Sequence, residues 1–402
     1  MYICPREVCT GCGACVNACP KSCIMWVKDD LDTFYPEIKE DICIHCGACH
    51  RVCPNNNEIE YRLPIKTYAA WSIDKENRRT SASGGITSEF YLYTLRKGGF
   101  TCGAELTLDK GVNYIPLQRK EDINRVKNSK YVYSHTNDIY KQVRLALKDD
   151  KFVFFVGLPC QVAGLKTFLG KNADDKNLLT ADIICHGVSN EDYLFQFVHA
   201  IEKKKKRKAE ALFFRDPSYG TEAYVFTLRA KDVFYKQNHF GTNLYYIGYM
   251  DELIYRENCY HCRYARKERI SDLTFGDFDG LGKEKPVDYW TKQVSMCLVN
   301  TNKGEHFLRE VSEHLFLQER TLEEAVKPQR QLKMPAKGHP RRKEFVDEYK
   351  KTRNFNQVTH KILRDKIRNN IIQKLFNVFI TTPLSYITPK GLRSQIKKII
   401  KK

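Results

Sequence analysis

The sequence contains no long apolar run. Its 402 residues include no stretch of about 18 consecutive apolar residues, the length that a helix needs to cross a bilayer. Its first residues are rich in cysteine instead of the apolar side chains of a secretory signal. These absences predict a cytoplasmic protein without a transmembrane helix, in a compartment where thiols stay reduced.

Cysteine is abundant where disulfides are not expected. The chain has 16 cysteines, and 10 of them lie within the first 53 residues. In a reducing compartment, so many closely spaced thiols indicate metal binding. A hydrophobic content of 42% is typical of a globular chain, and the length is sufficient for two or three domains.

Positive charge is concentrated at the C-terminal end. Residues 327–402 contain 21 Lys and Arg against 4 Asp and Glu, a balance of +17. Residues 1–326 contain 46 against 44, a balance of +2. The formal charge of +19 is therefore a property of the tail and predicts no partner for the body.

The N-terminal cysteines form an internal repeat. CTGCGACVNACP begins at Cys9 and CIHCGACHRVCP begins at Cys43, and both follow C-x2-C-x2-C-x3-C-P. In this pattern three thiolates bind one [4Fe–4S] cluster and the fourth binds the other. Zinc knuckles are the disfavoured alternative, because zinc sites use four ligands without this five-element pattern. We predict two clusters, one bound by Cys9, Cys12, Cys15 and Cys53 and the other by Cys43, Cys46, Cys49 and Cys19.

Two further cysteines of this segment, Cys4 and Cys23, fall outside the repeat. We predict that both are small buried hydrophobic residues. Over residues 1–57 the repeat resembles the bacterial two-cluster ferredoxins. That resemblance implies a module for one-electron transfer.

Residues 67–326 alternate short apolar runs with amphipathic stretches, which predicts an α/β or α+β domain. FVFFV at 152–156 and LLTADII at 178–184 are apolar enough to be interior strands of a partly parallel sheet, and each precedes a helical pattern. Ligands of such sheets bind beyond the carboxyl ends of the strands, where Cys160 and Cys185 lie. Parallel strands would bring both thiols to one edge.

Cys259 and Cys262 have the two-residue separation of half a metal site. Cys160 and Cys185 are plausible partners, whereas Cys102 and Cys297 lie in strand-like contexts and are expected to be structural. A third [4Fe–4S] cluster, a zinc ion and no metal are three open interpretations, because ligand identity alone does not select the metal.

Two loops are candidate ligand-binding segments. Ser83, Gly84 and Gly85 precede a helical pattern, and the free amides of such a turn can bind a cofactor phosphate, although most such turns only cap the helix. ISDLTFGDFDG predicts a strand and a turn that carries Asp277 and Asp279. Two interpretations are open for these carboxylates and for Asp272. They can be ligands or proton-handling groups, or they can be parts of a solvated turn.

TSASGGITS, SKYVYS, GLPCQVAGL, ICHG and the C-x2-C segment with ISDLTFGDFDG occur in this order over residues 67–326. The ordered set resembles the coenzyme F-420 hydrogenase/dehydrogenase beta-subunit family, which includes deazaflavin-reducing hydrogenase subunits and 7-hydroxymethyl chlorophyll reductases. The resemblance implies FAD and a third [4Fe–4S] cluster, and it favours the cluster over zinc. By the matching motifs, Cys160, Cys185, Cys259 and Cys262 would bind that cluster, and FAD would lie near Ser83, Gly84, Gly85, Lys130 and Tyr131.

The sequence thus predicts an α+β protein in three parts: a two-cluster ferredoxin domain at 1–57, an FAD and [4Fe–4S] domain with a mixed sheet at 67–326, and a basic helical tail at 327–402. The predicted function is that of an iron–sulfur flavoprotein oxidoreductase that passes electrons between a ferredoxin-type donor, or another enzyme subunit, and an unidentified two-electron acceptor. Some members of the resembled family carry such a module in front, and some of these resemble proteins associated with surface-polysaccharide synthesis. The alternative is an electron-transfer subunit of a larger redox complex without its own substrate site.

The tail carries an amphipathic pattern. KILRDKIRNNIIQKLFNVF places apolar residues at four-residue intervals with basic residues between them. Such a helix can lie on the anionic inner face of the membrane, or it can dock on its own domain with the charges outward. Both interpretations stay open, and no nucleic-acid partner is expected because no base-reading motif is present. The apolar positions are Leu363, Ile367, Ile371, Leu375 and Phe379, followed by Leu392, Ile396 and Ile399.

Overall fold

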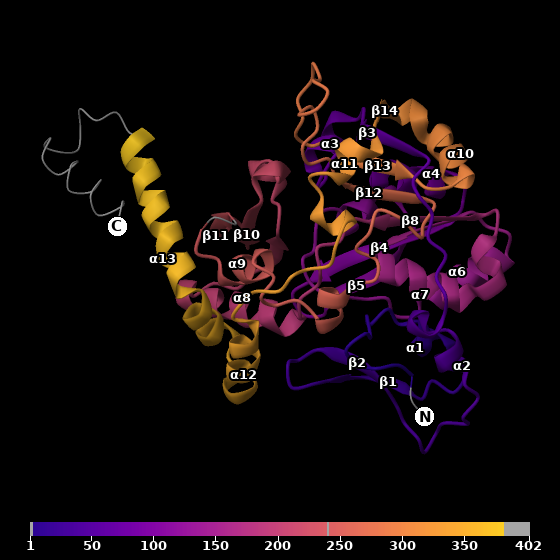
Figure 1. Ribbon diagram of the computed structural model, residues 1–402, viewed down its shortest axis with the longest axis horizontal. Coiled ribbons are helices and arrows are strands. Elements are labelled where there is room, and N and C mark those ends of the chain that lie inside the picture. Colours follow the sequence, from indigo (N-terminus) through magenta and orange to yellow (C-terminus); the bar gives the residue numbers. More distant parts are fainter. Residues whose placement is uncertain (1–2, 239–240, 382–402) are drawn as a thin grey trace, which may run out of the picture.

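The N-terminal domain repeats one local structure twice. The computed structural model describes residues 3–238 and 241–381 (Figure 1). Gly13 precedes helix α1 (Ala14–Ala18) and Gly47 precedes helix α2 (Ala48–Arg51), with φ values of 82° and 70°. Glycine adopts this left-handed conformation without a Cβ clash, which explains its place after each cysteine pair. An antiparallel ribbon, β1 (Ile24–Lys28) and β2 (Phe34–Ile38), connects the two halves.

A nine-stranded mixed sheet organises the larger domain. The two predicted apolar strands are β7 and β8, which pair in parallel at the centre of the sheet, as predicted. Parallel pairing continues from β8 to β12 and from β7 to β4. The strand order is β14 (Leu315–Arg320), β3 (Lys66–Ser72), β13 (Ser295–Val299), β12 (Leu273–Asp277), β8 (Leu178–Ile183), β7 (Val153–Gly157), β4 (Phe100–Thr107), β5 (Gly111–Leu117) and β6 (Ser134–His135).

Helices cover both faces of this sheet. Phe154 on β7 packs on the rings of α4 (Ile86–Arg96), whereas its neighbour Phe155 packs on Tyr140 of α6 (Ile139–Lys148), because successive strand residues point to opposite faces. Two-sided burial explains why β7 and β8 are continuously apolar. The helices of this domain are α3 (Lys75–Thr80), α4 (Ile86–Arg96), α5 (Ile123–Val126), α6 (Ile139–Lys148), α7 (Pro159–Leu169), α10 (Asn302–Val311) and α11 (Leu322–Val326).

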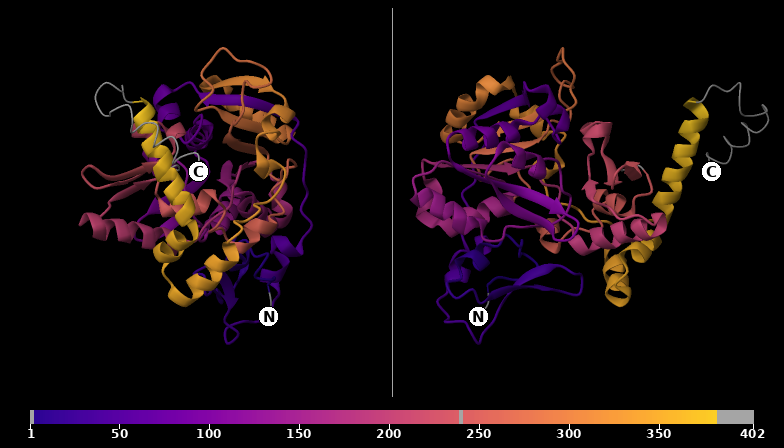
Figure 2. Two further views of the ribbon diagram at one scale, coloured as in Figure 1. Left: turned by 60° about the vertical axis from the view of Figure 1, so that its left-hand side comes forward. Right: turned by 180° about the vertical axis from the view of Figure 1, so that it is seen from behind.

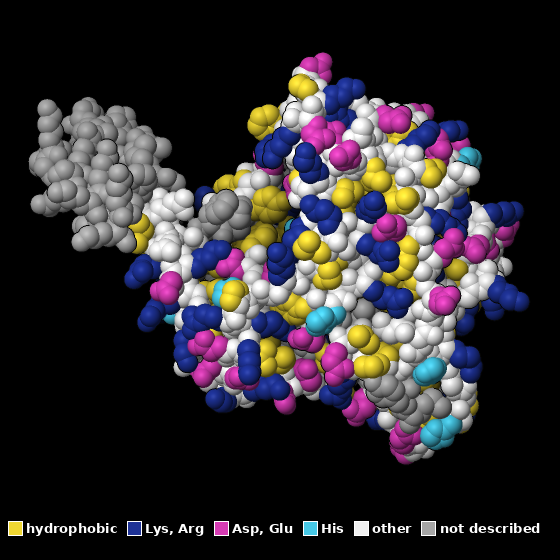
Figure 3. Space-filling view, in the orientation of Figure 1, with side chains coloured by type: hydrophobic (Ala, Val, Ile, Leu, Met, Phe, Trp, Pro, Cys, Tyr) yellow, Lys and Arg dark blue, Asp and Glu magenta, His cyan; other side chains and the backbone are white. Residues whose placement is uncertain are grey.

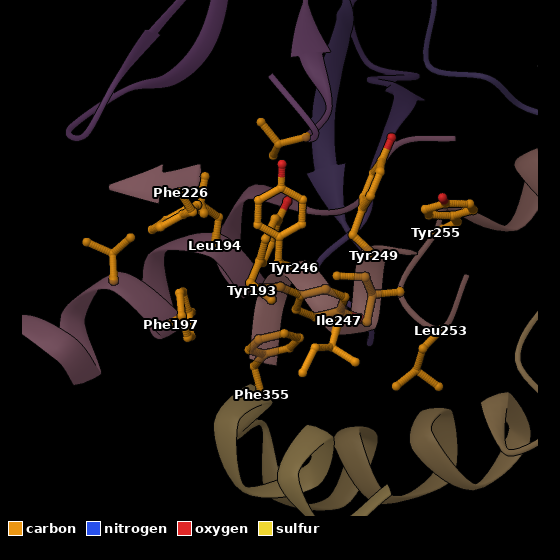
Figure 4. Close-up of a cluster of buried hydrophobic side chains, with 14 of the residues drawn as sticks. Tyr193, Leu194, Phe197, Phe226, Tyr246, Ile247, Tyr249, Leu253, Tyr255 and Phe355 are labelled. Carbon is orange, nitrogen blue, oxygen red and sulfur yellow. The ribbon is translucent and has the colours of Figure 1, made fainter. Parts of the chain in front are cut away.

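A smaller sheet lies beside the large domain and has its own aromatic core (Figure 2). Its strands are β9 (Ala211–Phe213), β10 (Val225–Arg229) and β11 (Val233–Asn238), and the helices around this core are α8 (Glu191–Lys205), α9 (Leu244–Met250), α12 (Arg342–Thr352) and α13 (Phe355–Thr381). Tyr193 and Phe197 from α8 and Tyr246 from α9 meet in this core (Figure 4). Phe355, at the start of α13, stacks on Tyr193 with ring centroids 5.1 Å apart.

The first half of the tail helix belongs to this core. Leu363 and Ile367 are buried, whereas Ile371 is 43% exposed as α13 leaves the body (Figure 1). The predicted positions from Leu375 onward lie outside the side chains that the structure describes. On the face shown in Figure 3, Lys and Arg are interspersed with Asp and Glu and form no single basic patch. Among the described residues, every helix is too short or too polar to span a bilayer.

Candidate redox sites

Two small cavities in the N-terminal domain are each lined by four cysteines of the repeat. Cys9, Cys12, Cys15 and Cys53 line a first cavity of about 320 Å³. Cys19, Cys43, Cys46 and Cys49 line a second cavity of about 300 Å³. The fourth cysteine of each motif thus lies with the other motif's first three. These donor sets fit [4Fe–4S] clusters, and the assignment of each thiol to an iron stays a prediction.

Solvent access differs between the two cavities. All four thiols of the first cavity are buried, whereas Cys46 of the second cavity is exposed and Cys43 is partly so. Ile44, beside Cys46, is 56% exposed. The second cavity is therefore the one that an external redox protein can approach.

Cys4 and Cys23 are buried, as predicted, yet each lines a cluster cavity. Cys4 lies in the first cavity, and the Cys23 sulfur lies 3.3 Å from the Cys19 sulfur in the second. A hydrogen bond from Cys4, together with the nearby Arg256 guanidinium, lowers the pKa of Cys9 to about 6. Neither thiol belongs to the repeat, so the repeat does not predict that they line these cavities.

A third cavity of about 700 Å³ is lined by Cys160, Cys185, Cys259 and Cys262. The parallel strands β7 and β8 end at one sheet edge, which brings Cys160 and Cys185 together. A 3-10 turn over Glu257–His261 carries Cys259, and Cys262 follows it. Burial raises the pKa of each thiol, that of Cys259 to about 12. Buried thiolates need a cationic partner, so this donor set fits an iron–sulfur cluster or zinc.

The first and third cavities are neighbours. Thr10, between two cysteines of the first motif, also lines the third cavity. The Cys12 loop rests on α7, where a Cβ added at Gly164 would lie 2.9 Å from the Cys12 sulfur. Two buried tyrosines fix this loop: Tyr133 donates to the Gly11 carbonyl at 2.6 Å, and Tyr140 donates to the Cys12 carbonyl at 2.8 Å.

A wide cavity of about 2060 Å³ adjoins the third one on the sheet side. This volume includes space that is open to solvent, so the cavity can be reached from outside. Its lining includes Ser83, Gly85, Lys130 and Tyr131. The two cavities share the wall formed by Leu158, Gln161, Ile184, Cys185, His186, Gly187 and Val188.

The predicted cofactor residues contribute to this cavity in different ways. Gly85 precedes α4 with φ 82°, so free amides of the helix start lie at the cavity. Gly84 supports the turn from behind: its amide donates to Ser295 Oγ at 2.8 Å, and an added Cβ would lie 2.4 Å from the Ala70 carbonyl oxygen. A side chain at this position would clash with the neighbouring strand, which explains why the residue is glycine.

Lys130 is held by the end of a helix. Its Nζ donates to the carbonyls of Val126, Lys127 and Asn128 at 2.7, 2.6 and 3.2 Å. Burial lowers the pKa of Lys130 to about 7, although three acceptor carbonyls favour the charged form. Because its head group is occupied, Lys130 shapes the loop that carries Tyr131.

The far wall of the wide cavity is polar. Asp277, at the end of β12, accepts from Arg215 Nη1 at 2.7 Å and from Tyr224 Oη at 3.1 Å. Asp279 accepts from Gln329 Nε2 at 3.0 Å, and burial, followed by the charge of Asp277, raises the pKa of Asp279. Asp277 and Asp279 thus both line the cavity, but Asp277 is partly buried on β12, whereas Asp279 lies in the turn that follows and is partly exposed to solvent.

Asp272 has a structural role. It is buried and accepts from the Thr180 amide at 2.9 Å and from the Thr180 hydroxyl at 2.8 Å. The motif search missed Arg215, Tyr224 and Gln329, because they come from the small sheet domain and a C-terminal loop without a recognisable pattern.

Comparison with known proteins agrees with this organisation. Residues 8–57 match the model of the 4Fe-4S dicluster domain, and residues 150–325 match the model of the C terminus of the coenzyme F420 hydrogenase/dehydrogenase beta subunit. The matches define an iron–sulfur protein of the electron-transfer class. Residues 150–325 are thus related to the F420 hydrogenase/dehydrogenase beta subunits, and a dicluster domain stands in front of them, which confirms the resemblance seen in the sequence.

One similar solved structure is a chain of the xenon-derivatised F420-reducing [NiFe] hydrogenase complex from Methanosarcina barkeri. The identity is 16% and the TM-score is 0.40, over 80% of this chain and 94% of that chain. A likeness at this level carries no functional argument. No curated protein matches the chain significantly.

Proposed function

We propose that the chain is an iron–sulfur flavoprotein oxidoreductase that passes electrons between a ferredoxin-type donor and a two-electron acceptor. The order of the cavities carries this proposal: the second opens to solvent, the first contacts the third, and the third shares a wall with the wide cavity. When bound, [4Fe–4S] clusters supply one-electron steps, and a flavin couples such steps to two-electron chemistry.

In this proposal three sets of four thiols hold the clusters. Burial raises the pKa of every thiol of the third set, so these four contribute ligand charge only when a cationic core is present. Cys160 lies in the first turn of α7, directly after β7, and Cys185 follows β8, so both are positioned by rigid elements. The sets are Cys9, Cys12, Cys15 and Cys53; Cys19, Cys43, Cys46 and Cys49; and Cys160, Cys185, Cys259 and Cys262.

The wide cavity would hold FAD. The helix start at Ser83 and Gly85 suits the pyrophosphate, since unpaired amides and the helix dipole attract anions. Tyr131 lies against Tyr249, with ring centroids 4.9 Å apart, and offers an aromatic surface at the same cavity. The shared wall at Cys185 and His186 would bring the flavin beside the third cluster.

The acceptor would occupy the polar end of this cavity. The Arg215–Asp277 pair and Asp279 can bind and orient a polar substrate and exchange protons with it. This set of polar side chains at one end of the cavity favours an enzyme with its own substrate site. The alternative, an electron-transfer subunit of a larger complex, is favoured by the matched family, which is one of beta subunits.

Metal and flavin analysis of the full chain tests the proposal. After anaerobic purification, three cubanes predict about twelve irons per chain, with flavin retained after reconstitution. About eight irons with one zinc would contradict the third cluster, and absence of flavin would contradict the enzyme. Flavin-dependent turnover of a diffusible acceptor by the isolated chain separates the enzyme from the electron-transfer subunit.

A further inference from the structure

Arg256 is a buried arginine at the contact between the N-terminal domain and the sheet domain. It is 3% exposed and lies three residues before Cys259. Its Nε donates to the Cys9 carbonyl at 3.0 Å, and its Nη1 donates to the Phe34 carbonyl at 2.7 Å. One side chain thus joins a ligand segment of the third cavity to a ligand segment of the first.

Its charge has no carboxylate partner among the described residues. The other deeply buried arginines each have one: Arg215 pairs with Asp277, Arg269 with Asp182 and Arg320 with Glu324. Arg256 is surrounded instead by the rings of Tyr35 and Tyr133, whose centroids lie 4.4 and 5.6 Å from the guanidinium carbon. Its Nη2 is buried and has no hydrogen-bond partner within residues 3–238 and 241–381.

A buried charge of this kind requires compensation. An unpaired charge in a low-dielectric interior costs several kcal/mol or more. The sulfurs of Cys9 and Cys259, which line different cavities, lie within its electrostatic reach and carry negative charge when they bind a cluster. A cluster with four thiolate ligands is an anion and becomes more negative when it is reduced. A fixed positive charge beside it therefore favours the reduced form, and a low dielectric enlarges that effect.

We infer that Arg256 is a positioning residue that raises the reduction potentials of the clusters at Cys9 and Cys259 and so favours electron movement from the exposed second site into the protein. The inference rests on the proposed function, because it needs clusters in both cavities. The two backbone hydrogen bonds place the guanidinium, and its charge sets the potential. These two roles can be separated by substitution.

The test is an anaerobic redox titration of the full, cluster-loaded chain, followed by electron paramagnetic resonance. Arg256→Gln and Arg256→Met remove the charge, and Arg256→Lys keeps it. We expect at least one cluster signal to titrate at a lower potential in the two neutral variants and close to the wild-type potential in the lysine variant. Iron and sulfide are assayed first, so that a failure of the proposed function appears as missing clusters in the wild type.

Arg51→Gln is the matched control. Arg51 Nη1 donates to the Cys46 carbonyl at 2.8 Å beside the second cavity, but this arginine is exposed and its charge is screened by water. Its loss should leave every potential unchanged. Full iron content with unshifted potentials in both neutral variants would overturn the inference. If the neutral variants lose iron, retention in Arg256→Lys supports the charge role, whereas loss in all three variants assigns Arg256 to packing and overturns it.

Discussion

Gly164 on α7 lies directly against Cys12 of the first cysteine motif: a Cβ added to the glycine would be 2.9 Å from both the Cβ and the sulfur of Cys12. This contact joins two domains that lie far apart in the sequence. It also explains a glycine inside a helix, where glycine costs about 1 kcal/mol relative to alanine.

Gly164→Ala should therefore destabilise the chain, although the same change usually stabilises a helix. Overpacking against Cys12 should lower the free energy of unfolding by about 1–3 kcal/mol, which urea unfolding of the loaded, anaerobic chain can measure by circular dichroism. Gly248→Ala on α9 is the control, because the added carbon would lie 3.3 Å from the Ile254 side chain and 3.7 Å from that of Thr359, which is less close than the contact at Gly164. Equal or higher stability for Gly164→Ala would contradict this contact.

The third thiol set leads to a prediction about metal content. Cys160→Ser should reduce iron from about twelve to about eight atoms per chain, because a [4Fe–4S] cluster needs its thiolates and the N-terminal cavities use other ligands. Inductively coupled plasma mass spectrometry would count iron and zinc together.

Cys102→Ser is the control for that experiment. Cys102 is fully buried on β4 and lies in none of the three thiol-lined cavities. Its substitution should leave the iron content unchanged. Loss of one zinc with no loss of iron in Cys160→Ser would show that the third site is a zinc site.

The redox residues differ in how far the sequence could predict them. Cys160 and Cys185 were predictable because two apolar strands and the parallel-sheet rule bring strand ends together. Arg215 and Tyr224 reach the wide cavity only through the packing of the small sheet domain, and no local pattern encodes that contact. The spacing of residues close in sequence therefore identifies metal ligands, whereas the packing of distant segments decides which polar groups line the wide cavity.

The tail illustrates the same limit. Four-residue periodicity predicted an amphipathic helix, and α13 is a helix. The apolar stripe did not say what covers it. In the structure, Leu363 and Ile367 belong to the aromatic core together with residues of α8 and α9, so the described first part of the stripe docks on its own domain.

The ion pair between Arg215 and Asp277 predicts an effect on substrate use. Arg215→Ala should lower kcat/KM for a diffusible acceptor by about tenfold or more, because a loss of about 1.4 kcal/mol in transition-state binding has that effect. Steady-state kinetics with flavin and iron contents checked would measure it.

Arg229→Ala provides the matched control for this pair. Arg229 lies on β10 of the same small sheet and pairs with buried Asp216, but neither residue lines the wide cavity. This variant should lose stability and keep kcat/KM. If Arg215→Ala and Arg229→Ala lower kcat/KM equally, the Arg215–Asp277 pair has only a structural role.

Asp279 predicts a pH dependence of stability. Burial and the neighbouring Asp277 raise the pKa of Asp279, so the folded chain keeps this proton at pH values where the unfolded chain has released it. Between the unfolded value of about 3.9 and the raised folded value, the native state binds more protons, and stability falls as pH rises. Asp279→Asn cannot ionise and should lack this fall.

The measurable quantity is the difference in unfolding free energy between the wild type and Asp279→Asn. As pH rises through that window, the wild type should lose unfolding free energy relative to Asp279→Asn, and above the window the difference should stay constant. Asp288→Asn removes an exposed carboxylate from the same connection between β12 and β13 and corrects for the change in net charge. A difference that instead grows in favour of the wild type with rising pH would mean that the ionised form is stabilised, and Arg215 would then be its partner as well as that of Asp277.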